Sequence, residues 1–361
     1  SGVWIMAYTD IDKPSDYFET LLSTGDGGSQ TFTGLDFQPD WVWSKRRQTH
    51  VHQLYDSVRT AGSGKALQSD ATAAEGGDGG TYGYLSSFTS DGFASTAGSS
   101  NNNYFNASGG TYVFWNWKAG TSFTNDASGT GIGSIDSTGS VNTDAGFSII
   151  SYTGNGNSGQ TIAHGLGSTV DMVIVKDRSR NGENWVIYHK SLGKDKLLLF
   201  NTDAAATSSN YWGSSTPNST VFGVKDGNTS NNWSGDNFIA YCFAEKQGYS
   251  KFGSYTGNGN ADGTFVYTGF RPAMVIYKKS SGTENWFIHD NKRQGFNPEN
   301  ELLFPDLNNA EGTVNRIDLL SNGFKATTSD GGINGSGDVY IYMAFAENPF
   351  VTSTGVPATA R

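Results

Sequence analysis

Length, composition and charge exclude several classes of protein. The chain has 361 residues, of which 13% are aromatic, so it is too rich in aromatic residues to be disordered. The sequence contains no run of about 18 apolar residues that would cross a bilayer as a helix. With 24 Lys and Arg against 34 Asp and Glu, the net charge of −10 disfavours nucleic acid as a partner, and a single Cys excludes an internal disulfide.

The first part of the chain predicts a short arm followed by a β-rich unit. We expect residues 1–21 to form an N-terminal arm, in which Ser15–Leu22 is the single candidate for a short helical turn. The first unit is predicted at 22–118. It starts with a Thr-Gly-Asp-Gly turn, continues with the strand Trp41–Trp43 and closes with the aromatic strand Phe114–Lys118.

The rest of the chain repeats this unit twice. A stretch rich in Gly, Ser and Thr at 119–146 predicts a linker or a surface hairpin. Two further units are predicted at 147–249 and 250–350, and 351–361 is expected to be a C-terminal tail. The string Ser-Tyr-Thr-Gly-Asn-Gly-Asn at 151–157 recurs letter for letter in the third unit. These features predict an all-β fold of three tandem repeats of about 95 residues, each a small antiparallel β-sandwich of jelly-roll type.

Three architectures are compatible with such repeats. The first, which we favour, is three β-sandwiches in tandem. The second is one larger β assembly with internal pseudo-threefold symmetry. The third is an elongated β-solenoid, but solenoid repeats are only about 20–30 residues long, so the long period of this chain disfavours it.

Carboxylates and histidines give no catalytic pattern. Glu183 and Glu284 stand in matched Glu-Asn-Trp motifs, and a pair of carboxylates is what glycoside hydrolysis needs. A catalytic residue is seldom duplicated at the same position of tandem repeats, so we interpret both as structural. His50 and His52 alternate along a strand as metal ligands do, but no third ligand is signalled, and we interpret them as ordinary hydrogen-bonded side chains. We therefore predict that the protein is not an enzyme.

Aromatic side chains in polar loops are the better candidates for a binding site. Tyr211, Trp212 and Trp233 lie in segments rich in Ser, Asn and Gly, and Tyr104 lies in a similar loop. An exposed aromatic ring stacks on a sugar ring while neighbouring amides bind the hydroxyl groups, so we predict these four residues as receptor or glycan contacts. The alternative is that such a Trp folds back over the domain core.

A basic cluster and an acidic turn add two further candidates. Lys45, Arg46 and Arg47 follow one another at a strand end. They suggest either an anion contact, for phosphate or lipopolysaccharide, or a solvated edge or interdomain salt bridge. The Asp-rich turn 226–236 has oxygen ligands of the kind that Ca²⁺ prefers but lacks an ordered ligand spacing. No cofactor is predicted, and bound calcium is left open.

Four strings of the sequence resemble a known family. They are Phe-Gln-Pro-Asp-Trp-Val-Trp-Ser-Lys-Arg-Arg at 37–47, Leu-Tyr-Asp-Ser-Val-Arg at 54–59, Thr-Tyr-Val-Phe-Trp-Asn-Trp-Lys-Ala-Gly at 111–120 and Tyr-Met-Ala-Phe-Ala-Glu-Asn-Pro-Phe at 342–350. In these strings the chain resembles phage virion structural proteins, the tail-fibre-like or adhesin-like proteins of marine and cyanobacterial phages. The similarity covers Pro14 to Phe350, nearly the whole chain.

The resemblance implies an extracellular protein of the virion. It implies assembly as a homo-oligomer, such as a trimer, together with other virion proteins, and a host surface glycan or protein as partner. The function that we expect is a non-catalytic tail-fibre or adhesin component that binds the host cell. One alternative is a capsid decoration or head-fibre protein with no receptor role, and a second is a glycan depolymerase. Neither a nucleic acid partner nor a membrane span is expected.

Overall fold

The computed structural model describes residues 9–225, 227 and 230–349, and its regular structure is nearly all β. Strands take 43% of the chain and helices 3%, in several antiparallel sheets, which confirms the predicted all-β sandwich class. The helical turn expected over Ser15–Leu22 is shorter than predicted. A 3-10 turn covers Pro14–Asp16, and strand β1 (Phe18–Thr24) follows it, because β1 pairs with the aromatic strand β7 (Thr111–Trp117).

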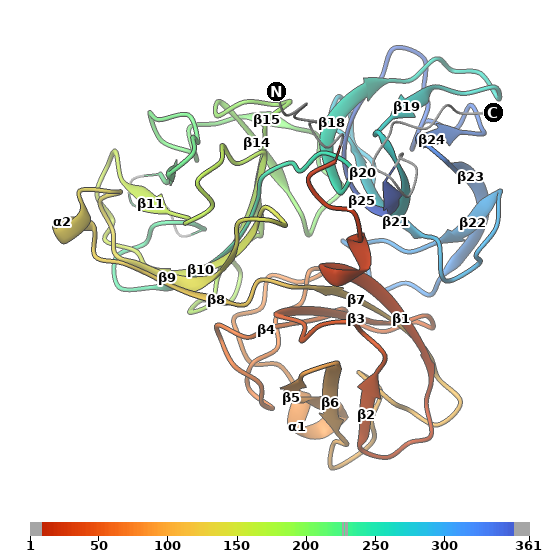
Figure 1. Ribbon diagram of the computed structural model, residues 1–361, viewed down its shortest axis with the longest axis horizontal. Coiled ribbons are helices and arrows are strands. Elements are labelled where there is room, and N and C mark those ends of the chain that lie inside the picture. The colour runs from red at the N-terminus through yellow and green to blue at the C-terminus, as the bar shows by residue number, and fades with distance from the viewer. Residues whose placement is uncertain (1–8, 226, 228–229, 350–361) are drawn as a thin grey trace, which may run out of the picture.

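Three antiparallel sheets with one common strand order form the inner layers of three lobes around a common centre (Figure 1). We call these lobe 1 (residues 18–118), lobe 2 (119–249) and lobe 3 (250–349). The inner sheet of lobe 1 has the order β1, β7, β3 (Trp41–Arg46), β4 (Gln53–Asp56). In lobe 2 the matching order is β10 (Phe147–Thr153), β17 (Asn237–Phe243), β12 (Met172–Asp177), β13 (Val186–His189), and in lobe 3 it is β18 (Ser250–Thr256), β25 (Val339–Pro349), β20 (Phe270–Lys279), β21 (Trp286–Asp290).

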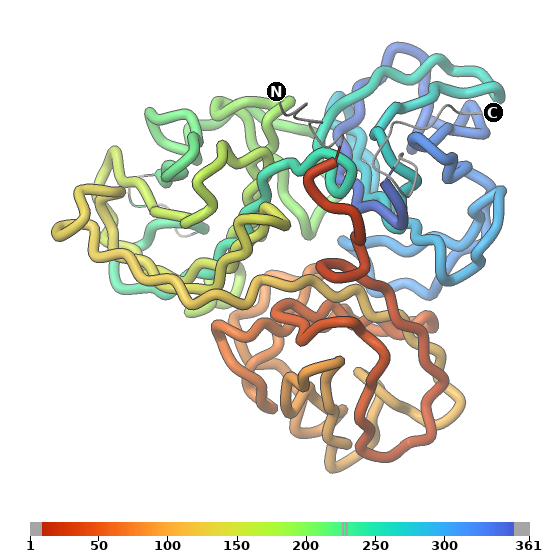
Figure 2. Tube along the Cα trace, viewed as in Figure 1, coloured from red at the N-terminus to blue at the C-terminus, as the bar shows by residue number. Residues whose placement is uncertain are grey.

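The sheet of lobe 2 is extended on both sides. The chain leaves lobe 1 after Trp117 and crosses to lobe 2 along the segment that Figure 2 draws in yellow. This segment forms β8 (Thr121–Asn125) and β9 (Ser137–Asn142), an antiparallel pair that adds to β10. On the other edge the sheet gains β14 (Lys196–Leu199) and β15 (Thr207–Ser208).

A second, outer sheet covers the inner sheet of each lobe. The outer sheets are β2 (Gln30–Thr33), β6 (Gly92–Thr96) and β5 (Tyr84–Thr89) in lobe 1, β11 (Thr161–Ala163) and β16 (Val221–Gly223) in lobe 2, and β19 (Phe265–Tyr267), β24 (Gly323–Ala326), β23 (Gly312–Leu320) and β22 (Glu299–Leu302) in lobe 3. Each lobe has its own apolar core between its two layers. The two α-helices among the described residues, α1 (Gly79–Tyr82) and α2 (Ala127–Thr130), have four residues each, so neither is long enough to cross a membrane.

The other faces of the three inner sheets meet in one shared core at the centre. This cluster of buried residues draws side chains from all three lobes. The ring of Trp41 lies 4.4 Å from that of Trp117 in its own lobe and 4.4 Å from that of Tyr241 in lobe 2, measured between ring centres. Phe345 of lobe 3 lies 5.7 Å from Trp117. The lobes are therefore sandwiches that bury their inner faces against one another, an arrangement close to the second of the three architectures.

Indole hydrogen bonds join neighbouring lobes around this core. Trp185 stands just before β13, and its Nε1 donates to the backbone oxygen of Gln68 in lobe 1 at 2.8 Å. Trp286 is the first residue of β21, and its Nε1 donates to the backbone oxygen of Leu199 in lobe 2 at 2.9 Å. Lobe 3 is thus tied to lobe 2, and lobe 2 to lobe 1.

A histidine completes the ring. His52 occupies the matching position before β4 in lobe 1, and its Nε2 lies 2.9 Å from the backbone oxygen of Phe304 in lobe 3. Its Nδ1 accepts from the indole of Trp43 at 2.8 Å, so Nε2 carries the proton and donates. Burial lowers the pKa of His52 well below its usual range and keeps the ring neutral. The three hydrogen bonds run in one direction around the centre, from lobe 3 to lobe 2, from lobe 2 to lobe 1 and from lobe 1 to lobe 3. They therefore form a closed, head-to-tail ring within one chain.

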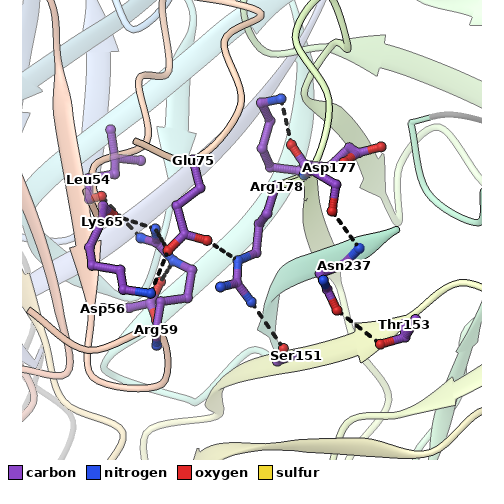
Figure 3. A network of polar contacts seen from close by, with 12 residues as sticks. Leu54, Asp56, Arg59, Lys65, Glu75, Ser151, Thr153, Asp177, Arg178 and Asn237 are labelled. Atoms are coloured by element: carbon purple, nitrogen blue, oxygen red, sulfur yellow. Dashed lines mark hydrogen bonds and ion pairs between the residues drawn. The ribbon is translucent and has the colours of Figure 1, made fainter. Parts of the chain in front are cut away.

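Ion pairs cross all three lobe junctions, and at the junction of lobes 2 and 3 Lys251 pairs with Glu245 at 2.5 Å. All three share a backbone hydrogen bond, from Glu75 to Arg178, from Glu311 to Arg47 and from Ala206 to Ser280. Arg178 Nε lies 2.5 Å from Glu75 Oε2, in the network that Figure 3 shows between lobes 1 and 2. Arg47 Nη2 lies 2.6 Å from Glu311 Oε1 between lobes 1 and 3. At the matching position of the third junction Ala and Ser replace the charged pair, and the backbone bond remains.

Candidate functional site

The repeated Thr-Gly-x-Gly string forms a turn that packs against a second loop in each lobe. In lobe 2 the side chain of Asn232 holds this turn, since its Oδ1 accepts from the N–H of Asn155 at 3.1 Å and its Nδ2 donates to the oxygen of Asn157 at 2.9 Å. Gly154 is required because a Cβ there would lie 2.3 Å from the backbone oxygen of Trp233. The corresponding pairs are Asn106 with Gly25 in lobe 1 and Asn334 with Gly257 in lobe 3. The repeated string therefore has a structural role.

The residue after this asparagine differs among the lobes. It is Ala107 in lobe 1, Trp233 in lobe 2 and Gly335 in lobe 3, and the backbone oxygen of each faces the turn glycine. The indole of Trp233 is 38% exposed. Because Ala and Gly occupy the matching position in the other two lobes, with the backbone oxygen facing the turn in the same way, the fold does not need an indole there.

One charged side chain lies over the indole of Trp233, and a second holds that side chain in an ion pair. The guanidinium carbon of Arg180 lies 4.9 Å from the centre of the ring, and Arg180 Nε forms an ion pair with Asp236. The side chain of Arg180 is itself 41% exposed. A cation fixed over the ring orients the indole and leaves its remaining exposed surface to solvent, with charged groups at its rim.

A second pair of an aromatic ring and a cation lies at the same end of lobe 2. Lys225 Nζ lies 4.9 Å from the ring centre of the half-buried Tyr211. Asn231, the neighbour of Asn232, joins the two, because its Nδ2 donates to the oxygen of Tyr211 at 2.7 Å and its Oδ1 accepts from the N–H of Lys225 at 3.3 Å. Tyr211 and Trp233, two of the four predicted contacts, thus belong to one loop cluster.

The other two predicted aromatic contacts are buried. Trp212 has no exposed surface and packs edge-to-face on Tyr188 in the core of lobe 2, with 5.8 Å between ring centres. Tyr104 is 5% exposed and packs between Tyr82 and His50. Neither presents a ring face to a ligand, so the predicted contact role is corrected for both. The sequence misled because the loops of both residues are polar, and polar composition does not indicate that an aromatic side chain in the loop turns inward and packs on the core.

The basic cluster is divided between the interior and a lobe junction. Lys45 is fully buried, and its Nζ donates to the oxygens of Arg46 and Gln48; burial lowers the pKa of this lysine to about 8. Arg46 donates to the side chain of Asn103 at 2.7 Å. Arg47 forms ion pairs with Glu301 and Glu311 of lobe 3. The predicted joint anion contact is therefore corrected, and the interdomain salt bridge that we weighed against it is what Arg47 makes.

The remaining candidates for chemistry are dispersed. Glu183 of lobe 2 accepts a hydrogen bond from Ser230 at 3.1 Å, whereas Glu284 belongs to lobe 3, so the two lie in separate lobes. Burial raises the pKa of the Cys242 thiol and so disfavours the thiolate. Among the residues that the structure describes, no group of three or more His, Cys, Asp or Glu side chains is placed to hold a metal. Residues 226, 228 and 229 of the turn considered for calcium lie outside the described residues.

Comparison with known proteins gives a family and no function. A family model described as a domain of unknown function, DUF7483, matches residues 13–349. No curated protein matches the chain, and no solved structure matches it.

Proposed function

Because the chain belongs to the DUF7483 family of domains of unknown function, we propose its role from its own geometry and from the resemblance of its sequence to phage virion proteins. The protein is a non-catalytic virion component that binds a glycan on the host surface through the loop of Trp233. The observation that carries this proposal is an exposed indole at a position where the other two lobes have Ala and Gly.

The surroundings of Trp233 suit a sugar better than an apolar ligand. The apolar C–H face of a pyranose packs on an aromatic ring and removes both surfaces from water. The guanidinium of Arg180 lies over the indole, where its N–H groups are donors for hydroxyl groups, and the carboxylate of Asp236 holds Arg180 in an ion pair. The indole is the single aromatic anchor of this site, and polar groups lie around it. An aromatic centre with a polar rim is the usual composition of a binding hot spot.

The virion assignment rests on the resemblance. The four strings that carry it lie mainly in β3, β4, β7 and β25, and three of these strands supply aromatic side chains to the central core, namely Trp41, Trp43, Trp115, Trp117 and Phe345. The strings therefore identify the fold. We expect receptor specificity to reside in the loops, because the loops differ in sequence among lobes that share one fold. Homo-oligomerisation and contacts with other virion proteins are part of the same proposal, and sedimentation equilibrium of the 38.6 kDa chain tests the first of these.

Binding to host cells tests the function directly. The purified full chain is applied to intact candidate host cells, before and after enzymatic removal of surface glycans. We expect saturable binding that glycan removal abolishes and that Trp233→Ala weakens by about tenfold or more, equivalent to about 1.4 kcal/mol. The variant is benign for folding, because Ala is the natural residue at position 107 of lobe 1.

A matched control separates the indole from general surface hydrophobicity. Phe265 on β19 of lobe 3 is 44% exposed, so Phe265→Ala removes a similar apolar surface far from the loop, and its binding is expected to equal that of the unaltered chain. Equal binding by Trp233→Ala and the unaltered chain would contradict the proposed site. An absence of binding by folded protein would favour the structural alternative, a capsid decoration or head-fibre protein.

A further inference from the structure

A hollow lies at the opposite end of lobe 2 from Trp233. Its walls are residues 118–123, which include the start of β8, residues 141–144, which are the end of β9 and the turn after it, and the residues Tyr17 and Gly165. Its volume is about 550 Å³. We propose that this hollow binds a neutral oligosaccharide. The proposal shares only its ligand class with the proposed function, and the site is separate from the loop of Trp233.

The register of β10 and β17 separates the two sites. Phe147 pairs with Phe243 at one end of these strands, and Thr153 pairs with Asn237 at the other. The hollow adjoins the first end through residues 141–144, whereas Trp233 precedes β17 at the second. Seven residues of strand span about 20 Å, so a single sugar residue does not reach both.

The size and shape of the hollow suit a chain of sugars. Small-molecule sites in proteins measure roughly 300–1,000 Å³, and this hollow lies within that range. A neighbouring hollow of about 360 Å³ shares Gly120, Ser122 and Phe123 with it. Both lie along β8, the edge strand of the eight-stranded sheet, so a ligand that crosses Phe123 would occupy the two together.

The walls offer both apolar and hydrogen-bonding surface. Tyr17 and Phe123 supply partly exposed aromatic rings, and Thr121 and Ser122 supply exposed hydroxyl groups. The Oδ1 of Asn142 accepts from the N–H of Ala145 at 2.9 Å, which orients the amide within the wall. Rings that pack on C–H faces and short polar side chains that reach hydroxyl groups are the combination that a saccharide requires.

The charges of the hollow favour a neutral ligand. Lys118 and Asp144 both line it, and neither forms an ion pair with another residue of the described parts of the chain. Lys118 Nζ instead lies 5.6 Å from the ring centre of Tyr17. Partial burial, with Asp144 nearby, raises the pKa of Tyr17, so its hydroxyl stays a donor. One ammonium and one carboxylate cancel locally, and the net charge of −10 repels an acidic polysaccharide at long range.

An array of immobilised neutral and acidic oligosaccharides tests this proposal with the full chain. The unaltered protein, Trp233→Ala, Asp144→Ala and the control Asp91→Ala are applied in parallel. Asp91 is another exposed aspartate, on lobe 1 and outside both hollows. We expect at least one neutral oligosaccharide that Trp233→Ala and Asp91→Ala retain and that Asp144→Ala binds at least tenfold more weakly.

The two sites fail in different ways on this array. Loss of every bound neutral glycan in Trp233→Ala, with Asp144→Ala unaffected, would overturn the hollow and leave the proposed function standing. Binding confined to acidic glycans, or binding of no glycan that depends on Asp144, would overturn it as well. Equal melting temperatures of the variants show that a lost signal is not unfolding, and Lys118→Met, which removes the opposite charge, is expected to weaken the same glycan as Asp144→Ala.

Discussion

Three lysines at matching positions give the molecule an unusual set of buried charges. Lys45, Lys176 and Lys278 are the next-to-last residues of β3, β12 and β20. All are fully buried, and each Nζ donates to the backbone oxygen of the next residue. Burial lowers the pKa of each of these ammonium groups to about 8. In each lobe the methylene chain of the lysine lies in the interior, and its ammonium group is hydrogen-bonded to a main-chain oxygen. This arrangement requires a long cationic side chain.

These lysines predict a rise in stability above about pH 8. Between about 8 and 9 the unfolded chain holds more protons on them than the folded chain does, so the free energy of unfolding increases with pH, by at most about 1.4 kcal/mol per pH unit for each lysine. Closer to pH 10 the buried tyrosines oppose this rise, because burial raises the pKa of Tyr152, Tyr241 and Tyr249 and the folded chain then holds the extra protons. Below about pH 8, burial raises the pKa of Asp306 to about 7 and of Glu299 to about 8, so the folded chain holds the extra protons and stability falls as pH rises. The two trends meet in a minimum near pH 8.

Denaturant unfolding at several pH values between about 6 and 9 checks this minimum. Lys176→Met is expected to flatten the rise above pH 8 by about a third, because it removes one of three groups with the same shift. Lys194→Met, on the surface, serves as the control and is expected to leave the profile unchanged. A profile that falls steadily from about pH 8 to 9 would show that the lysines are not buried as ammonium groups.

For single residues, the sequence indicates which side chains are candidates for a binding site but does not indicate whether each side chain faces the core or the solvent. Trp212 and Trp233 lie in equally polar segments, yet one packs in the core and the other is exposed. Composition does not report which way a ring turns. Comparison of the three units was the available signal, since the positions of Ala107 and Gly335 identify Trp233 as dispensable to the fold. The hollow beside Lys118 was not predicted, because the segments that line it are distant in sequence and carry no shared motif.

The turn of each lobe is where an element positions the candidate site. Gly154→Ala would place a Cβ 2.3 Å from the backbone oxygen of Trp233, so the loop of Trp233 must move away. We expect a loss of about 1–3 kcal/mol in the free energy of unfolding, the usual cost of overpacking, and weaker glycan binding than that of the unaltered chain. Gly64→Ala is the matched control, because a Cβ there meets no atom within 4 Å and the backbone conformation is not left-handed. Unaltered stability of Gly154→Ala in thermal and denaturant unfolding would contradict the role of the turn.

Elements were predictable from the sequence where period and repetition agree. The short apolar runs that end in Lys are β3, β12 and β20, and the closing aromatic runs are β7, β17 and β25, as the repeated units indicate. The Gly, Ser and Thr content of residues 119–146 predicts a linker or a surface hairpin. It does not predict that β9 pairs with β10 and extends the sheet. Strand partners depend on which polar edge meets which neighbour, and polar strands such as β8 specify their register weakly.

At the scale of the whole molecule, repetition within one chain replaces the association of separate subunits. Each lobe leaves an apolar inner face that a single sandwich would expose to water, and the central core covers all three at once. The ring from Trp286 through Trp185 to His52 satisfies a buried donor at every junction. Two of the three donors are tryptophan indoles and the third is a histidine, so the hydrogen bond at each junction is kept although the donor side chain differs.

The shared core predicts that the chain unfolds as one cooperative unit. Three independent sandwiches would melt in up to three steps, since small domains unfold separately. Here the loss of one lobe would expose the central faces of the other two, including Trp41, Tyr241 and Phe345, so partial unfolding is unfavourable. Tryptophan fluorescence, which reports on all three lobes, and far-ultraviolet circular dichroism are expected to give coincident transitions, with equal calorimetric and van't Hoff enthalpies.

A substitution at one junction sharpens this test. Glu75→Gln removes the charge partner of Arg178 between lobes 1 and 2 and is expected to destabilise the protein by about 1–3 kcal/mol, because both side chains are largely buried. In a cooperative molecule the entire transition moves to lower temperature, including the signal from lobe 3, which Glu75 does not contact through this ion pair. Separate domains would instead show a transition of lobe 3 that stays in place while the others shift. That second result would mean that the lobes only touch at the centre, and that the ring of hydrogen bonds does not couple their stabilities.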